Sequence, residues 1–311
     1  MLKLDRIKII SHINFINDID GKIFISNIRD NTVLYYKYKQ ISPFLLMIMV
    51  NFENNELIIE FTGKILLEGY KDLIHGGNIR QCLDTINKMG ICKLDVDSIV
   101  THGYVAKCDV TKDIRVENFS MIVRYCRQQL KNYRKWICRD YASGVVIENV
   151  VKTPRYKKRL VVYDKYKELQ KSENECFLAT ISNGKALLDS YRGIVRFELN
   201  INTMAQIRTL LSVNDNSLNA VLASEANPIL AVIDEALREH SSIRPCTNLR
   251  DYERVLFLKE CHNDLMEVEA KMRTLVSNNT SIRRVMKPYI ELYQQMQNTA
   301  DLGFDIRKMV A

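Results

Sequence analysis

The chain has 311 residues, 47% of them hydrophobic, and a formal net charge of +8. That length and composition are enough for a sizeable core, in two domains or in one large one. The longest apolar run, residues 44–50, has only the length of a strand, which excludes a membrane-spanning helix. The first residues show strand-like alternation without a signal-peptide pattern, so we expect an intracellular protein.

The predicted elements change in character along the chain. Residues 1–115 consist mostly of short β-prone runs separated by Asn, Asp and Gly, interrupted by a helix at 78–88. An amphipathic helix at 116–133 and three more strands follow, the last at 194–201. Beyond residue 205 strand patterns vanish, and the sequence predicts helices at 204–211, 228–239, 248–262, 265–276 and 281–297. We therefore expect an α+β fold, with an antiparallel-sheet domain with flanking helices at 1–205 and an all-helical domain at 206–311.

Positive charge is concentrated in one window, residues 121–160. It contains eleven Lys or Arg and two carboxylates, a net charge of +9, so the rest of the chain is close to neutral. Five aromatic residues lie among these charges: Tyr125, Tyr133, Trp136, Tyr141 and Tyr156. Cations neutralise phosphates and aromatic faces stack on bases, so the window favours a nucleic acid, single-stranded in particular. A solvated helix with inward-facing aromatics is the simpler interpretation.

The eight cysteines form no Cys-x-x-Cys pair and have no regular spacing. We expect reduced thiols that pack as small hydrophobic residues, rather than disulfides or a zinc site.

Alternation along the strands predicts a shared polar surface. Residues i and i+2 of a strand share a face, so Tyr163 and Lys165 lie together if their strand continues that far. Asp109, Glu198 and Glu60 occupy the polar faces of three other strands. Carboxylates are ligands for Mg²⁺ or Mn²⁺, and a tyrosine beside a metal or cation can act as a nucleophile. The pattern indicates phosphoryl transfer, although half-exposed strands commonly have polar outer faces.

Two segments resemble the replication initiators of filamentous phages and related plasmids, the gene II/X family. TPRYKKRLVVYDKYKEL (153–169) and RGIVRFELNI (192–201) match, in order and spacing, a basic run before a Tyr-x-Lys strand and a Val-Arg-Phe-Glu strand. Residues 106–111 look like the family's Arg-Ile-Asp-x-Thr strand. Glu60 with residues 64–69 looks like its Glu strand and following turn. Where the family has histidine, this chain has Tyr70 and Lys71, so we assign no metal histidine.

The resemblance implies a nuclease domain and a rolling-circle initiator that nicks and religates one DNA strand at the origin. Tyr163 would attack a phosphodiester and remain on the 5′-phosphate, leaving a 3′-OH primer. Lys165 would hold the scissile phosphate or compensate the tyrosinate, and the three carboxylates would hold Mg²⁺ or Mn²⁺. The implied partners are origin DNA, single-stranded or supercoiled, and a host helicase and polymerase in the bacterial cytoplasm. The residues expected to contact DNA are Arg155, Lys157, Lys158, Arg159 and Arg196.

Alternatives remain at this point. Tyr166 could also serve as a nucleophile if the strand becomes helical after Tyr163. The chain could instead be a non-catalytic origin-binding initiator or repressor, because residues 265–276 and 281–297 have helix-turn-helix proportions, with Arg283, Arg284 and Lys287 near the start of the second helix. Pro288 counts against an unbroken recognition helix. An RNA-binding protein that uses the aromatic and basic window is a remoter possibility.

Overall fold

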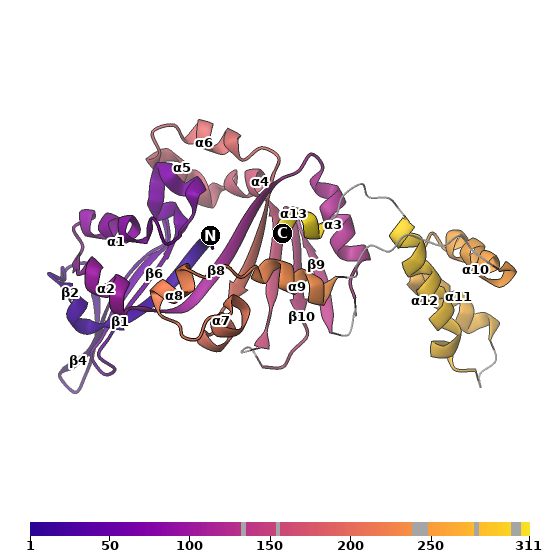
Figure 1. Ribbon diagram of the computed structural model, residues 1–311, viewed down its shortest axis with the longest axis horizontal. Coiled ribbons are helices and arrows are strands. Elements are labelled where there is room, and N and C mark those ends of the chain that lie inside the picture. The colour runs from indigo at the N-terminus through magenta and orange to yellow at the C-terminus, as the bar shows by residue number, and fades with distance from the viewer. Residues whose placement is uncertain (132–134, 154–155, 238–247, 277–279, 300–305) are drawn as a thin grey trace.

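A computed structural model describes residues 1–131, 135–153, 156–237, 248–276, 280–299 and 306–311. It is a mixed α+β structure built on one large antiparallel sheet, with a helical part toward the C-terminus (Figure 1). The expected fold class is therefore confirmed in outline. None of the described helices is both long and apolar enough to cross a membrane.

Within the described residues the central sheet has ten strands, and every neighbouring pair is antiparallel. The strands in spatial order are β3 (Ile25–Arg29), β4 (Thr32–Gln40), β5 (Leu46–Asn51), β6 (Glu56–Thr62), β1 (Leu4–His12), β8 (Tyr104–Arg115), β12 (Ile194–Ile201), β11 (Arg159–Asp164), β10 (Gly144–Asn149) and β9 (Trp136–Tyr141). Strands β8, β12 and β11 adjoin, which agrees with a shared polar surface for their side chains. Strand β6 does not, because β1 lies between it and β8.

The alternation read from the sequence sets the two faces of this sheet. In β12, Val195, Phe197, Leu199 and Ile201 are at most 2% exposed, and Leu160 and Val162 of β11 are fully buried beside them. Burying each such side chain stabilises the fold by about 1.5–3 kcal/mol. The intervening residues, which are polar in β12, are therefore held on the opposite face.

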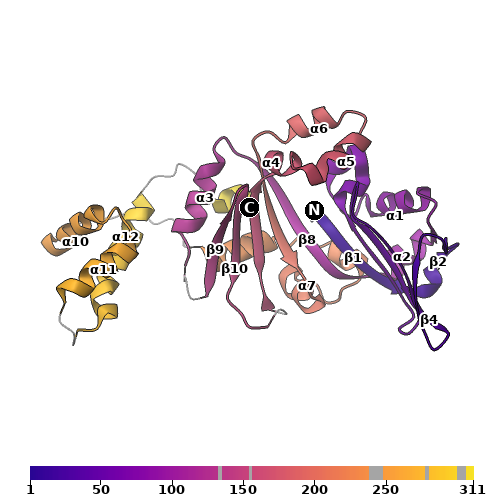
Figure 2. The ribbon, with the colours of Figure 1, turned by 180° about the vertical axis from the view of Figure 1, so that it is seen from behind.

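Helices from both halves of the chain cover the apolar face. They are α2 (Val96–His102), α3 (Phe119–Gln128), α7 (Met204–Leu211), α8 (Leu218–Leu222), α9 (Pro228–Ala236) and α13 (Ile306–Val310). Their buried side chains join those of the strands in one hydrophobic cluster, and Figures 1 and 2 show α7–α9 on one side of the sheet. The core thus extends through α9 and includes α13. It therefore crosses residue 205, where the sequence predicts the domain boundary.

The polar face is covered at one end by a smaller layer. It is formed by the 3₁₀ segments η2 (Gly63–Asp72) and η4 (Ser172–Asn174) and by α4 (Lys165–Leu169), α5 (Glu175–Thr180) and α6 (Gly184–Ser190). A second hydrophobic cluster, which includes Tyr70, Phe177 and Tyr191, holds this layer together. Helix α1 (Ile79–Lys88), η1 (Ile13–Phe15) and a two-stranded sheet of β2 (Ile16–Asn17) and β7 (Lys93–Leu94) complete the fold.

Three further helices form a separate cluster near the C-terminal end. They are α10 (Leu249–Glu260), α11 (Leu265–Leu275) and α12 (Ile282–Thr299), which pack through a third hydrophobic cluster that includes Leu258, Val268 and Met286. Pro288 lies inside α12, which continues on both sides of it. The seven cysteines in the described part of the chain are free thiols, and five of them are buried.

Candidate active site on the polar face of the sheet

Three neighbouring strands bring the predicted site residues into register. Partners in an antiparallel pair lie on the same face with Cβ atoms about 5 Å apart, so one row of side chains runs across several strands. The rows across β11, β12 and β8 are Tyr163–Arg196–Asp113, Val161–Glu198–Thr111 and Arg159–Asn200–Asp109. Tyr163, Glu198 and Asp109 therefore lie on one face of the sheet in three successive rows, one residue on each strand.

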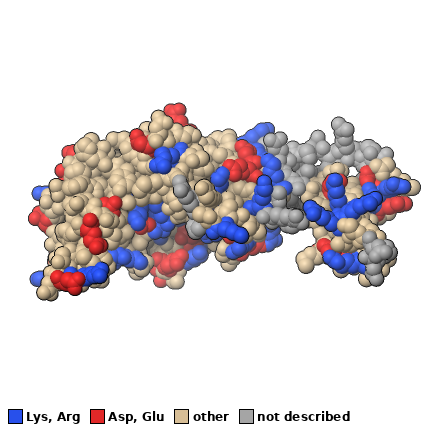
Figure 3. Space-filling model, turned by 90° about the horizontal axis from the view of Figure 1, so that it is seen from below, with Lys and Arg blue, Asp and Glu red and all other residues tan. Residues whose placement is uncertain are grey.

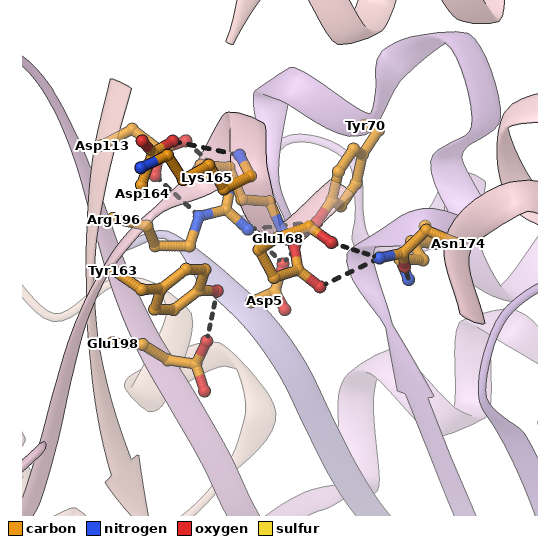
Figure 4. Close-up of polar contacts among 12 residues, drawn as sticks. Asp5, Tyr70, Asp113, Tyr163, Asp164, Lys165, Glu168, Asn174, Arg196 and Glu198 are labelled. Atoms are coloured by element: carbon orange, nitrogen blue, oxygen red, sulfur yellow. Dashed lines mark hydrogen bonds and ion pairs between the residues drawn. The ribbon is translucent and has the colours of Figure 1, made fainter. Parts of the chain in front are cut away.

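A chain of hydrogen bonds links the tyrosine to both carboxylates, and Figure 4 shows the first of them, from Tyr163 to Glu198. The Tyr163 hydroxyl donates to Glu198 Oε2 at 3.0 Å. The Asn200 amide nitrogen then donates to Glu198 Oε1 at 3.1 Å and to Asp109 Oδ1 at 3.0 Å. Arg159 donates to the amide oxygen of Asn200 at 2.6 Å, which fixes the orientation of the amide. No role was predicted for Asn200, although its i+2 spacing from Glu198 places it on the same face.

Burial raises the pKa of each acidic group in this chain of hydrogen bonds. Burial, followed by the negative charges of Asp5 and Asp109, raises the pKa of Glu198 to about 7. Burial also raises the pKa of Asp109 and, together with the Glu198 carboxylate, raises the pKa of Tyr163 well above its usual range. At rest the tyrosine therefore holds its proton, and the group that its hydroxyl contacts titrates near neutral pH.

The shifted pKa of Glu198 predicts a pH-dependent stability. A carboxyl whose pKa rises on folding contributes stability that is fully present below the unfolded value of 4.5 and is lost as pH rises through about 7. A rise from 4.5 to about 7 corresponds to roughly 3 kcal/mol. In EDTA, the free energy of unfolding of the wild type should therefore fall between about pH 5 and pH 8 by more than that of Glu198→Gln. Parallel curves of unfolding free energy against pH for the two proteins would contradict the raised pKa of Glu198.

The residues present fit a divalent cation in part. Asp109 and Glu198 supply two oxygen donors that face one amide group, and each carboxyl is more basic than usual, which a cation would offset. The predicted third ligand, Glu60, is not brought there: it pairs with Arg6, and β1 separates its strand from β8. In the described ranges no group of three or more His, Cys, Asp or Glu is arranged to hold a metal.

The structure corrects the environment expected for Lys165. Strand β11 ends at Asp164, whose side chain caps α4 by accepting the backbone N–H of Lys167 at 3.1 Å. Lys165 is therefore the first residue of a helix, only 2% exposed, and its ammonium bonds to Glu168 at 2.6 Å. It still lies 5.6 Å from the centre of the Tyr163 ring. This position suits compensation of a tyrosinate better than direct contact with a phosphate.

Tyr166 is placed in the covering layer and not in the hydrogen-bonded chain. It packs against the second hydrophobic cluster, and the Arg192 guanidinium lies 4.6 Å from the centre of its ring. Tyr163 therefore lies in the hydrogen-bonded chain on the sheet, whereas Tyr166 lies in the covering layer.

The prediction that Arg196 binds DNA is wrong. Its side chain is fully buried and donates to both oxygens of Asp113 at 2.7 Å, to Asp5 at 2.7 Å and to the Tyr70 hydroxyl at 3.1 Å (Figure 4). The layer that covers this end of the sheet closes over it, which alternation along a strand does not reveal. Arg196 therefore ties β1, β8, β12 and η2 together beneath the site.

The predicted basic run is partly engaged within the protein. Arg155 lies outside the described residues. The partners of the others are Glu148 for Lys157, at 2.9 Å, Glu235 for Lys158, and Asn200 for Arg159. Lys157 remains 44% exposed at its side chain, so it is accessible to an anion beside the site.

Comparison of the chain with protein-family models, with curated proteins and with solved structures finds no match in any of the three. The resemblance to the gene II/X initiators therefore stays a prediction from the motifs.

Proposed function

We propose that the protein is a site-specific DNA-nicking enzyme that initiates rolling-circle replication, with Tyr163 as its nucleophile. The observation that carries this proposal is the hydrogen bond from the Tyr163 hydroxyl to Glu198, which places a carboxylate where it can accept the proton of the nucleophile. A non-catalytic binder does not require a tyrosine held against a buried acid.

In the proposed reaction, the Tyr163 oxygen attacks a phosphodiester phosphorus while its proton passes to Glu198. The bond from phosphorus to the 3′ oxygen breaks, and that oxygen takes a proton from solvent. The products are a 5′-phosphotyrosine and a 3′-OH, and the reverse reaction religates the strand without another energy source. Lys165, 5.6 Å from the ring centre, offsets charge that develops on the phenolic oxygen.

A divalent ion, Mg²⁺ or Mn²⁺, fits this proposal as a cofactor that polarises the phosphate when bound. Asp109 and Glu198 are the residues that would hold it. Asn200 keeps both carboxylates oriented toward one point, and Arg159 keeps the amide of Asn200 from rotating.

The test is covalent attachment to DNA. Purified protein is incubated with Mg²⁺ or Mn²⁺ and a library of randomised single-stranded DNA labelled at the 3′ end, then separated in detergent. We expect label to move with the protein, because the tyrosine stays on the 5′-phosphate of the downstream fragment. Sequencing the attached DNA would give the site. The proposal would be overturned if the protein bound DNA but formed no covalent adduct with either metal. The same result would have to hold for supercoiled DNA.

The α10–α12 cluster favours a second role, recognition of the origin duplex. Arg283, Arg284 and Lys287 are exposed near the start of α12, and Figure 3 shows blue side chains over this part of the molecule, with red carboxylates among them. Such a module is compatible with the nicking enzyme and also with a non-catalytic initiator or repressor. The covalent adduct separates these two possibilities. A host helicase and polymerase are the further partners that the proposed activity requires.

The basic run should contribute to DNA affinity through its charge. Replacing Lys157, Lys158 and Arg159 by glutamine should weaken binding of single-stranded DNA and reduce the slope of log affinity against log salt by up to about two, because fewer counterions are released. A matched variant that neutralises the exposed cations Lys22, Arg29 and Lys39 at the other end of the sheet should bind normally. Equal slopes for the two variants would make the run an ordinary solvated surface.

A further inference from the structure

Two tyrosines lie on either side of a glycine at the edge of the site. Tyr141 of β9 pairs with Gly144 of β10, and Gly144 pairs with Tyr163 of β11. All three residues therefore face the same side of the sheet, with the two tyrosine backbones about 9–10 Å apart, twice the strand spacing. All three residues line one cavity, and the part of it between the two tyrosines forms a slot.

Close packing of the strands requires this glycine. A Cβ atom at Gly144 would lie 2.2 Å from the Val162 carbonyl oxygen and 2.7 Å from the Tyr163 Cβ, so no other residue fits without moving the nucleophile. The slot belongs to a cavity of about 220 Å³ whose apolar floor includes Val146 and Val161. The same glycine therefore lies in the wall of the cavity and allows Tyr163 to lie where it does.

The rim of the cavity is polar and carries positive charge. Arg159, Glu168 and Lys171 line it, and the Glu168 carboxylate is already engaged by Lys165. Lys171 is exposed. Tyr141 is 55% exposed at the end of a tight hairpin, so its ring is accessible to a ligand. Aromatic walls, an apolar floor and a cationic rim match the flat base and the phosphate of one nucleotide.

We propose that this slot binds the base of an unpaired nucleotide next to the scissile phosphate, with Tyr141 as the stacking wall. The inference rests on the proposed function, because it takes Tyr163 to be the residue that meets the phosphate. A base already stacked and paired within a duplex cannot enter between the two rings. The slot therefore makes the enzyme act on single-stranded DNA and fixes the register of the strand at Tyr163.

The experiment measures binding in a Tyr163→Phe background, which keeps the ring but lacks the nucleophilic oxygen. The probes are a fluorescent short oligothymidylate, the same backbone without bases, and its duplex. Tyr141→Ala should weaken oligothymidylate binding about tenfold or more, whereas Tyr141→Phe should bind like the parent. Phe52→Ala removes another exposed aromatic from a distant hairpin turn and should also bind normally.

The base-free backbone decides whether stacking is involved. If stacking is involved, the parent and Tyr141→Ala bind the base-free probe equally weakly, and the parent prefers oligothymidylate to the duplex. An equal loss on both single-stranded probes, or no loss with oligothymidylate, would overturn the slot. Adduct formation by the wild type is scored separately. An adduct without an effect of Tyr141→Ala overturns the slot alone, and a Tyr141-dependent base effect without an adduct overturns the nicking alone.

Discussion

Replacing Tyr163 by phenylalanine is expected to abolish both nicking and covalent attachment to DNA while leaving the protein folded. The change removes one oxygen and one hydrogen bond, to Glu198, at a cost of about 1 kcal/mol or less in stability. No other atom of the side chain can form a phosphoester, so the loss of adduct should be complete. Unpaired from tyrosine, Glu198 keeps its contact with Asn200. Adduct yield in a denaturing gel and a thermal melt measure the two effects.

Tyr166→Phe is the matched control, because it removes the same atom three residues further along the chain. Tyr166 packs in the covering layer and is absent from the hydrogen-bonded chain, so this variant should retain most of its activity. DNA binding should survive in both variants. If Tyr163→Phe still formed the adduct and Tyr166→Phe did not, the nucleophile would be Tyr166 and the assignment of the site would be wrong.

Arg196→Met should produce the largest loss of stability of any substitution near the site, about 3–5 kcal/mol. The guanidinium is fully buried and holds two carboxylates, Asp5 and Asp113, which are 18% and 22% exposed at their side chains. Without the cation both would lie in a poorly solvated region without their principal counter-charge. Urea unfolding followed by fluorescence of Trp136, the sole tryptophan and part of the same sheet, measures the change.

Arg192→Met is the control for Arg196→Met. Arg192 also pairs with an aspartate, Asp189, at 2.9 Å, but its side chain is 64% exposed. Solvent screens such a pair, so this variant should lose less than about 1 kcal/mol. Similar losses for the two variants would show that Arg196 is not the buried tie beneath the site.

Much of the sheet could be predicted from the sequence, because alternation reports directly which residues of a strand share a face. It assigned Glu198 and Asp109 to a common polar surface, and Asn200 follows by the same rule. Strand order could not be predicted in this way. Nothing in the alternation of β1 shows that it lies between β6 and β8, and this placement is what separates Glu60 from the other carboxylates.

The errors near the nucleophile come from local and tertiary effects. Asp164 caps a helix, so the strand ends one residue before Lys165, and the i+2 rule no longer applies. Asp5 was missed because a register shift between Leu4 and Arg6 disturbs the pairing of β1 with β8, and its role depends on contact with Arg196. The apolar faces of α7–α9 likewise do not indicate whether they pack on each other or on the sheet.

Peptide mapping of the protein–DNA adduct tests the central claim most directly. Trypsin cleaves after Arg159 and Lys165, so Tyr163 lies in the peptide 160–165 and Tyr166 falls in the next one. After the attached DNA is trimmed with nuclease, mass spectrometry should find a nucleotide phosphate on peptide 160–165, with fragmentation placing it on Tyr163. A nucleotide on any other peptide, or no adduct with DNA that the protein demonstrably binds, would contradict the assignment of Tyr163 as the nucleophile.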